Sequence, residues 1–329
     1  MRNNVLPSSN FRYNRITLLA VLAVMVLTLM FSALPDINLF WRELQNTGHT
    51  LFFIPVVILV LMLLRDTTIF FGCRPIKLYM AACTISLLVG TAIELIQLMT
   101  DRDANPMDIM RDLAGILTGL GLYASTDPEL QKHPLMPEKW LRAIIVTLSF
   151  GVFSASMLPL ALLSTAYAQR QAAFPLVVDL TASWMRPFLQ LKNAVIHEPD
   201  SGEISIDEKN RLTRIDLKKG SYPGLSVIEP FPDWSAYKTL TIIAYSKLVQ
   251  PIDLTLRIHD EHHNYAYTDR FNIQITLTEG TNYFQIPLED IKRAPVNRQM
   301  NMARIKNITF FSANPAEGMY FYVGQMRLE

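Results

Sequence analysis

Five long apolar runs in the N-terminal half of the chain restrict its fold more than any other feature. They cover residues 16–34, 49–64, 78–99, 107–123 and 141–167. A membrane-spanning helix needs about 20 mostly apolar residues. The runs at 49–64 and 107–123 are short, so they fit a tilted or partly re-entrant segment as well as a full crossing. The sequence therefore predicts an α-helical membrane domain with five transmembrane helices over residues 1–171.

Basic residues in the short loops predict the orientation of these helices. Most lysines and arginines of this half lie before the first run, between residues 65 and 77, and between residues 124 and 142, whereas the other two loops hold only Arg42 and Arg102. We therefore expect the N-terminus and the basic loops on the cytoplasmic side and, after five crossings, the C-terminal half outside. The first run is too long for a signal peptide and lacks a clear cleavage site, which favours an uncleaved helix.

The C-terminal half, from residue 172, alternates polar and apolar residues as short β-strands do. Strand candidates lie at 174–180, 224–231, 239–246, 252–260, 270–277, 282–288, 305–312 and 319–328, and a helical interruption is predicted at 183–194. This spacing predicts an all-β sandwich, a jelly roll, over residues 172–329. Both cysteines, Cys73 and Cys83, lie in the apolar half, so the β domain is predicted to fold without a disulfide.

Charged and amide side chains interrupt the apolar runs between residues 90 and 115. Helical spacing places Gly90, Glu94 and Gln97 on one face of the third helix. The same rule groups Asp108, Asp112, Gly115 and Gly119 on the fourth helix, where the two glycines would let a neighbouring helix approach closely. Arg102 lies in the loop between them, and His49 begins the second run.

These polar residues are predicted to meet at the outer end of the helices. An unpaired carboxylate in hydrocarbon costs several kcal/mol, so Glu94 should be protonated, face water, or pair with Arg102 or Arg111. We predict that one water-accessible pocket is formed by His49, Glu94, Gln97, Arg102, Asp108 and Asp112. A simpler interpretation makes Asn105 and Pro106 a helix start with Asp108 at the helix dipole, and leaves Arg111 and Asp112 in the headgroup region.

The ordered series of Gly90, Glu94, Gln97, Arg102, Asp108, Asp112, Gly115 and Gly119, with His49 upstream, resembles the VanZ-like membrane family over residues 46–123. Asp112 stands where that family usually has asparagine. The family is named after an accessory protein of glycopeptide (teicoplanin) resistance. The resemblance implies a multi-pass protein of the bacterial cytoplasmic (inner) membrane with a role in the cell envelope, rather than a particular reaction.

The β half resembles the galactose-binding-like jelly rolls found as carbohydrate-binding modules. The matching segments are "YPGLSV", "DWSAYKTL", "LRIHD", "YTDRFN", "IPLEDI" and "NITFF". Tyr265, Tyr267 and Trp234 are candidates for stacking on sugar rings. Packing in the core is the better interpretation for Trp234, whereas Tyr265 fits either role.

A polar patch at residues 257–272 contains three of the six histidines. His259, His262 and His263, with Asp260, do not have a standard metal-ligand spacing, so a loop of solvated histidines is favoured. Asp269 and Arg270 are predicted to form a structural ion pair. The chain has no phosphate-binding loop, zinc signature or dinucleotide fingerprint, and we expect no cofactor or metal.

The leading function is an envelope membrane protein with an external carbohydrate-binding domain, acting in cell-wall biogenesis or glycopeptide tolerance. Its predicted partners are the lipid bilayer and an envelope glycan or lipid-linked saccharide. The alternative is a membrane enzyme that uses Glu94, Asp108 or Asp112 as acid or base on a lipid-linked cell-wall intermediate. A transporter with Glu94 as proton carrier is less favoured, because no internal repeat is visible. The net charge of +1 gives no basic surface for nucleic acid.

Overall fold

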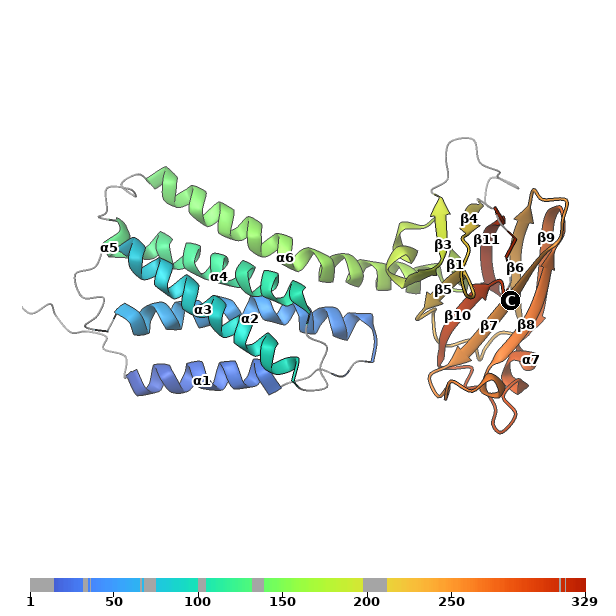
Figure 1. Cartoon of the computed structure of the whole chain (residues 1–329), viewed down its shortest axis with the longest axis horizontal. Coiled ribbons are helices and arrows are strands. Elements are labelled where there is room, and N and C mark those ends of the chain that lie inside the picture. Colours follow the sequence, from blue (N-terminus) through green and yellow to red (C-terminus); the bar gives the residue numbers. More distant parts are fainter. Residues whose placement is uncertain are drawn as a thin grey trace, which may run out of the picture. The chain divides into compact units, whose positions relative to one another are not determined.

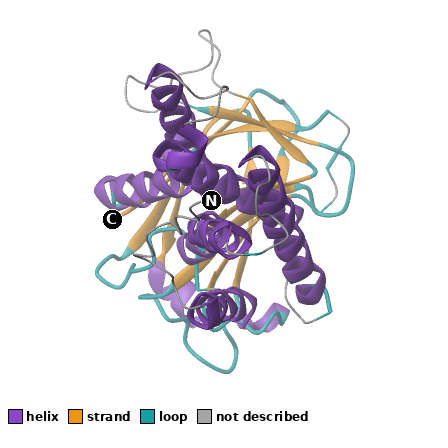
Figure 2. Ribbon diagram, turned by 90° about the vertical axis from the view of Figure 1, so that its left-hand side faces the viewer, coloured by secondary structure: helices purple, strands orange, loops and turns teal. Residues whose placement is uncertain are grey.

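The computed structural model describes residues 15–31, 35, 37–65, 67, 75–99, 105–131, 139–197, 212–313, 315–316 and 318–329. The chain divides into two compact units, Met1–Leu162 and Leu163–Glu329 (Figure 1). The division falls inside the long helix α6, which ends at Ala173, and the boundary at residues 171/172 stays a prediction. The first unit is helical, and the second contains the β-strands, drawn in orange in Figure 2.

The helical unit follows the predicted apolar runs. Its helices are α1 (Arg15–Phe31), α2 (Leu39–Arg65), α3 (Pro75–Gln97), α4 (Pro106–Thr126), the short α5 (Pro128–Gln131) and α6 (Lys139–Ala173). Among the described residues, α2, α3 and α6 are long and apolar enough to cross a membrane, and α1 is a shorter apolar helix. Helix α4 carries three charged residues near its start. The apolar helices are therefore present, whereas five crossings remain a prediction.

Helix α2 begins earlier than the sequence predicts. It starts at Leu39, and the side chain of Asn38 accepts a hydrogen bond from the backbone N–H of Trp41 at 3.1 Å, as a helix N-cap does. Five polar residues between 42 and 47 lower the hydropathy of residues 39–48, so a hydropathy criterion assigned this segment to a loop although it is helical. The prediction of a short second segment is wrong for this reason, and Arg42 lies on α2 rather than in a loop.

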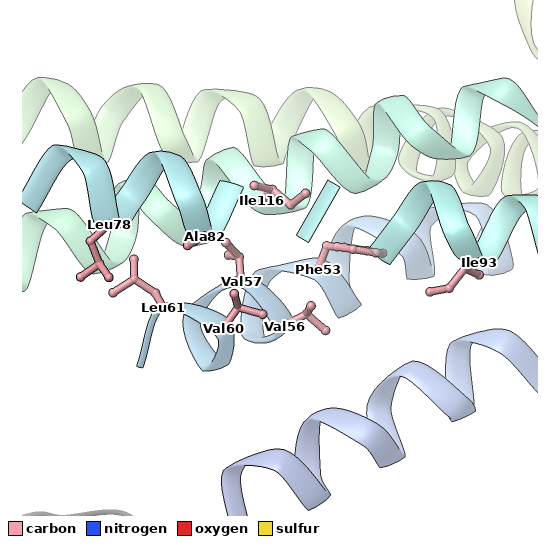
Figure 3. Packing of buried hydrophobic residues seen from close by; sticks show 9 residues of the cluster. All are labelled: Phe53, Val56, Val57, Val60, Leu61, Leu78, Ala82, Ile93 and Ile116. Carbon is pink, nitrogen blue, oxygen red and sulfur yellow. The ribbon is translucent and has the colours of Figure 1, made fainter. Parts of the chain in front are cut away.

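Helix α2 forms the centre of the helical unit and lies alongside α3 and α4. Figure 3 shows Leu61 near Leu78 of α3 and Val57 near Ala82 of α3 and Ile116 of α4. The ring of Phe53 reaches the Gly90 position of α3. These are apolar contacts of ordinary core packing.

Two glycines set the close approach of α4 to α2. A Cβ added at Gly115 would lie 2.4 Å from the backbone oxygen of Thr50, and one at Gly119 would lie 2.7 Å from that of Ile54. Larger residues would force the helices apart, so the predicted role of these small residues in helix packing is confirmed.

The β unit is a sandwich of two antiparallel sheets. Its strands are β1 (Leu176–Asp179), β2 (Leu189–Lys192), β3 (Ala194–His197), β4 (Thr213–Leu217), β5 (Gly224–Ile228), β6 (Thr239–Ser246), β7 (Ile252–Asp260), β8 (Phe271–Leu277), β9 (Gly280–Pro287), β10 (Ile305–Phe311) and β11 (Tyr320–Leu328). One sheet has the order β3-β4-β11-β6-β9, with β1 also paired to β11, and the other has the order β2-β5-β10-β7-β8. From β4 to β7 consecutive strands alternate between the sheets, as in a jelly roll.

The eight predicted strands are all present, and three short strands were missed. These are β2, β3 and β4. The helix predicted at residues 183–194 is wrong in its second half, because a 3-10 helix at Ser183–Phe188 is followed directly by β2. Pro187 lacks a backbone N–H and Phe188 is buried in the core, which ends the helical turn there. A short helix, α7 (Leu288–Arg293), follows β9.

The sandwich core is aromatic and aliphatic. Trp234 is fully buried, and its indole N–H donates a hydrogen bond to the backbone oxygen of Phe231 at 2.7 Å. A buried indole needs such a partner. The core interpretation of Trp234 is therefore confirmed, and this residue is not available to stack on a sugar.

Candidate functional site

Three helices bring the polar residues of the helical unit together. His49 comes from α2, Glu94 and Gln97 from α3, and Asp108 and Asp112 from α4, and all five are buried. Gly90, one turn before Glu94, makes this possible because a Cβ there would lie 2.4 Å from Oδ2 of Asp112. Arg102 lies outside the described residues.

The imidazole of His49 is held by the carboxylate of Asp112. His49 Nδ1 lies 2.9 Å from Asp112 Oδ1, and both side chains are almost inaccessible to solvent. A hydrogen bond at Nδ1 fixes the ring plane and leaves Nε2 as the free nitrogen. That nitrogen points toward Asp108, whose Oδ2 lies 3.8 Å away. The second nitrogen of the ring is thus directed into the cluster.

Glu94 has no cationic partner among the described residues. Arg111 forms an ion pair with Asp108 Oδ1 and lies 3.8 Å from Glu43, so its predicted pairing with Glu94 is wrong. Neither carboxylate oxygen of Glu94 makes a hydrogen bond of normal geometry, although the backbone N–H of Asn105 is near enough to interact with it. A buried carboxylate in this state is costly.

The simpler interpretation of residues 105–112, as a helix start and a headgroup segment, is correct for the helix start. The side chain of Asn105 accepts a hydrogen bond from the Met107 N–H at 3.0 Å, and Pro106 occupies the first turn of α4. It is wrong for Asp112, which is 1% exposed and packed between helices instead of lying in a solvated region. Asp108 combines both roles, since it lies in the first turn and also faces His49.

The outer face of one sheet of the β unit forms a groove of about 550 Å³. Its lining residues are Lys192, Tyr222, Gly224, Ser226, Thr255, Arg257, Tyr267, Arg270, Asn272, Thr309 and Phe311. The strand register builds its floor, because Ser226, Thr309, Arg257 and Asn272 are aligned across β5, β10, β7 and β8. Alternate residues of these strands point outward, which brings residues far apart in sequence into one row.

Aromatic rings and arginines alternate in this groove. The Arg257 guanidinium lies over the Phe311 ring at 4.7 Å and donates to Asn272 Oδ1 at 3.3 Å. The Arg270 guanidinium lies over the Tyr267 ring at 5.2 Å. Burial, followed by repulsion from the Arg270 charge, lowers the pKa of Arg257. The groove is therefore a positively charged surface with exposed rings.

The two predicted tyrosines differ in position. Tyr267 lines the groove and is 70% exposed, whereas Tyr265 is 91% exposed and lies outside the groove lining. Tyr265 is therefore not a core residue. The groove residues Lys192, Tyr222, Arg257, Arg270 and Phe311 were missed as site candidates. Of these, Arg257 and Phe311 occupy outward positions of β7 and β10, which was the sequence signal that could have indicated them.

The histidine patch is an ordered structure rather than a solvated loop. His263 packs against His259 with ring centroids 4.5 Å apart, and its Nδ1 lies 2.9 Å from the backbone oxygen of Asp269. Only His262 of the three has a largely exposed side chain. The prediction of solvated histidines is therefore wrong for the other two.

Asp269 pairs with Arg298, and not with Arg270 as predicted. Arg298 donates to both carboxylate oxygens of Asp269 and to both of Asp260, at 2.6–3.0 Å. The Arg298 guanidinium lowers the pKa of Asp269 far below its usual range. The partner was missed because it lies in a distant loop, while Arg270 points into the groove.

Comparison with known proteins finds no matching protein family and no similar curated protein. A family 11 carbohydrate-binding module from Clostridium thermocellum, in complex with a β-1,3-1,4-mixed-linked tetrasaccharide, is 16% identical over 46% of this chain and 93% of its own, with a TM-score of 0.35. An exo-β-agarase is 15% identical over 47% of this chain, with a TM-score of 0.34. The chain spans 24% of that agarase. The ligand of the groove must therefore be inferred from its own side chains.

Proposed function

We propose that this chain is an envelope membrane protein whose β unit binds an acidic glycan in the groove described above. One observation carries the proposal. The groove lining contains three cations, Lys192, Arg257 and Arg270, together with three aromatic rings, and no carboxylate. Uronate, sulfate and phosphate groups of a glycan are the anions that such a surface would bind.

The arginines are arranged to receive an anion. Arg257 and Arg270 repel one another, and Nε of Arg270 is buried without a hydrogen-bond partner among the described residues. An anionic group placed beside the two guanidinium groups would offset this repulsion. A neutral ligand would leave this repulsion in place, which favours an acidic saccharide over a neutral one.

The rings supply the second part of glycan recognition. Tyr222 and Tyr267 are 56% and 70% exposed, and they flank a floor of Ser226, Thr255 and Thr309 hydroxyls. Flat aromatic faces bind the apolar faces of sugar rings, while hydroxyls and Asn272 bond to sugar hydroxyl groups. This combination of charge and stacking suits a polysaccharide better than a single free anion.

The membrane half extends the proposal to the cell envelope. The long apolar helices support a bacterial cytoplasmic-membrane location, and the basic loops support a cytoplasmic N-terminus with an extracytoplasmic β unit. The ordered polar series over residues 46–123 is the support for a VanZ-like role in cell-wall biogenesis or glycopeptide tolerance. In this proposal the helical unit anchors the β unit at the outer face of the cytoplasmic membrane, where envelope glycans are available.

The acidic-glycan proposal is tested by binding of matched charged and neutral oligosaccharides to the full chain in nanodiscs. Oligogalacturonate and its methyl-esterified form share one sugar chain, and esterification removes the negative charges of the uronates. We expect the charged form to bind at least about tenfold more tightly, and Arg270→Ala to remove most of that difference, because a charge-assisted hydrogen bond contributes about 1.5–3 kcal/mol. Isothermal titration at low and moderate salt measures both effects.

Two control variants lie outside the groove. Arg293→Ala removes an exposed arginine of α7 that pairs with Glu289, and Tyr265→Ala removes the exposed ring that does not line the groove. Both should bind the oligosaccharide as the wild type does. Equal binding of the charged and esterified forms, or unchanged binding by Arg270→Ala, contradicts the proposal.

A further inference from the structure

We propose that His49, Glu94 and Asp108 bind one divalent first-row transition-metal ion within the helical unit. Each residue offers one ligand atom, and these atoms all lie within 4.8 Å of one another. Ligand atoms bound tetrahedrally to one ion at about 2.0–2.2 Å lie about 3.3–3.6 Å apart. The three side chains would have to close by roughly an ångström to coordinate the ion, which a rotamer adjustment can supply.

The orientation of His49 fits metal binding. Its Nδ1 is engaged by Asp112 Oδ1 at 2.9 Å, so Nε2 is the nitrogen that faces Asp108. A histidine ligand usually donates its other ring N–H to a carboxylate, which fixes the ring and strengthens the ligand nitrogen. Asp112 is therefore a positioning residue, and Gly90 provides the space that its carboxylate occupies.

The two carboxylates present free oxygens to the same point. Asp108 uses Oδ1 for the ion pair with Arg111 and directs Oδ2 toward His49. Glu94 is 5% exposed, and neither of its oxygens has a hydrogen-bond partner of normal geometry within the described residues. A metal ion would supply the partner that this buried carboxylate lacks.

The charges of the cluster also call for a cation. Glu94, Asp108 and Asp112 are three buried carboxylates, and Arg111 offsets only one of them. A divalent ion bound to neutral His49 would balance the remaining two. The ion would thus stabilise a group of acids that otherwise repel one another in a poorly solvated interior.

The ligand types narrow the choice of metal. Imidazole favours zinc and its neighbours in the first transition series, and two carboxylates also suit manganese. Three protein ligands leave at least one coordination position for water or a bound anion, as in zinc sites that bind substrates. The ligands come from three different helices, so no local sequence spacing could have indicated this site.

The test is metal binding by the full chain purified in detergent. After removal of metals by a chelator and dialysis against Zn²⁺ or Mn²⁺, elemental analysis should find one ion per wild-type chain. Glu94→Gln and Asp108→Asn keep the side-chain shape but remove a charged ligand, and each should lower affinity at least about tenfold. Asp112→Asn should lower the metal affinity by about 10–100-fold, since it changes only the residue that orients His49.

Asp127→Asn is the matched control, because Asp127 is a buried carboxylate of the same unit that pairs with Arg65 and does not belong to the cluster. It should bind the metal as the wild type does. Binding of Co²⁺ to the wild type gives a second measurement that needs no variant, since imidazole and carboxylate coordination produces visible absorption bands. A folded wild type that binds no ion and shows no Co²⁺ absorption overturns the proposal. Protons bound to the carboxylates would then reduce their mutual repulsion. Wild-type affinity in Glu94→Gln would also overturn it.

Discussion

Asp260 and Glu94 are both buried carboxylates, but their surroundings differ. In the β unit, Asp260 accepts two hydrogen bonds from Arg298 and one from the Asn301 N–H, between 2.6 and 2.7 Å. In the helical unit, Glu94 has neither a cation nor a well-formed hydrogen bond within the described residues. A buried carboxylate whose hydrogen bonds are all made stabilises the fold, whereas one without partners costs stability and is a candidate for binding.

A third buried carboxylate sharpens the contrast inside the helical unit itself. Asp127 lies between α4 and α5 and pairs with Arg65. Its carboxylate also accepts hydrogen bonds from the Tyr79 hydroxyl at 2.8 Å and from the Glu129 N–H at the start of α5 at 3.0 Å. It follows the pattern of Asp260. The poor partnering of Glu94 is therefore a property of that cluster, and not of the helical unit in general.

Removal of Arg298 should have the largest effect on stability. Arg298→Ala leaves Asp260 and Asp269 buried without their cation, and breaking such a buried pair costs about 3–5 kcal/mol. Chemical denaturation of the full chain, followed by the β signal in circular dichroism, measures the loss for the β unit. Arg304→Ala, an exposed arginine that lies 3.8 Å from Glu261, is the matched control and should change stability little.

The same network predicts how the stability of the β unit depends on pH. Arg298 lowers the pKa of Asp269. Burial alone would raise the pKa of Asp260, but the hydrogen bonds and charge of Arg298, together with the Asn301 N–H, lower it. A carboxylate with a depressed folded-state pKa contributes stability above its unfolded pKa of about 3.9, and this is lost as the pH falls. Denaturation between pH 3 and 7 should show a steeper loss for the wild type than for Arg298→Ala. If the stability of both proteins fell equally with pH, the Arg298 network would not be the cause of the pH dependence.

Asp127→Asn should have an intermediate effect. The variant keeps the shape of the side chain but weakens the bonds with Arg65 and Tyr79, so we expect a loss of about 1–3 kcal/mol. Thermal unfolding in detergent with a chelator present measures the loss. A variant as stable as the wild type would show that the Asp127 pairs are too weak to serve as the structural reference for Glu94.

The sequence predicts the helix faces and the strands well, because both follow from local periodicity. The spacing of Gly90, Glu94 and Gln97 placed them on one buried face, as the structure shows. Long-range pairings could not be read in the same way. Arg298 was missed because it reaches Asp260 from a distant loop, and the groove was missed because its floor depends on the register between four strands.

The start of α2 and the candidate metal site were missed for related reasons. Polar residues at 39–48 are compatible with a helix although they lower the hydropathy, and the Asn38 cap becomes visible only in three dimensions. The cluster of His49, Glu94 and Asp108 draws one residue from each of three helices. Sequence spacing can group residues within one helix but cannot decide which faces of different helices meet.

The stability of Glu94→Gln in the absence of metal tests the central claim most directly. If Glu94 is an unsatisfied group kept for binding, replacing its charge with an amide should leave unfolding in a chelator unchanged or raise the unfolding temperature slightly, unlike Asp127→Asn. Addition of Zn²⁺ or Mn²⁺ should then stabilise the wild type and not the variant. A large loss of stability in Glu94→Gln with the chelator present would contradict the account, because Glu94 would then be a structural carboxylate like Asp260.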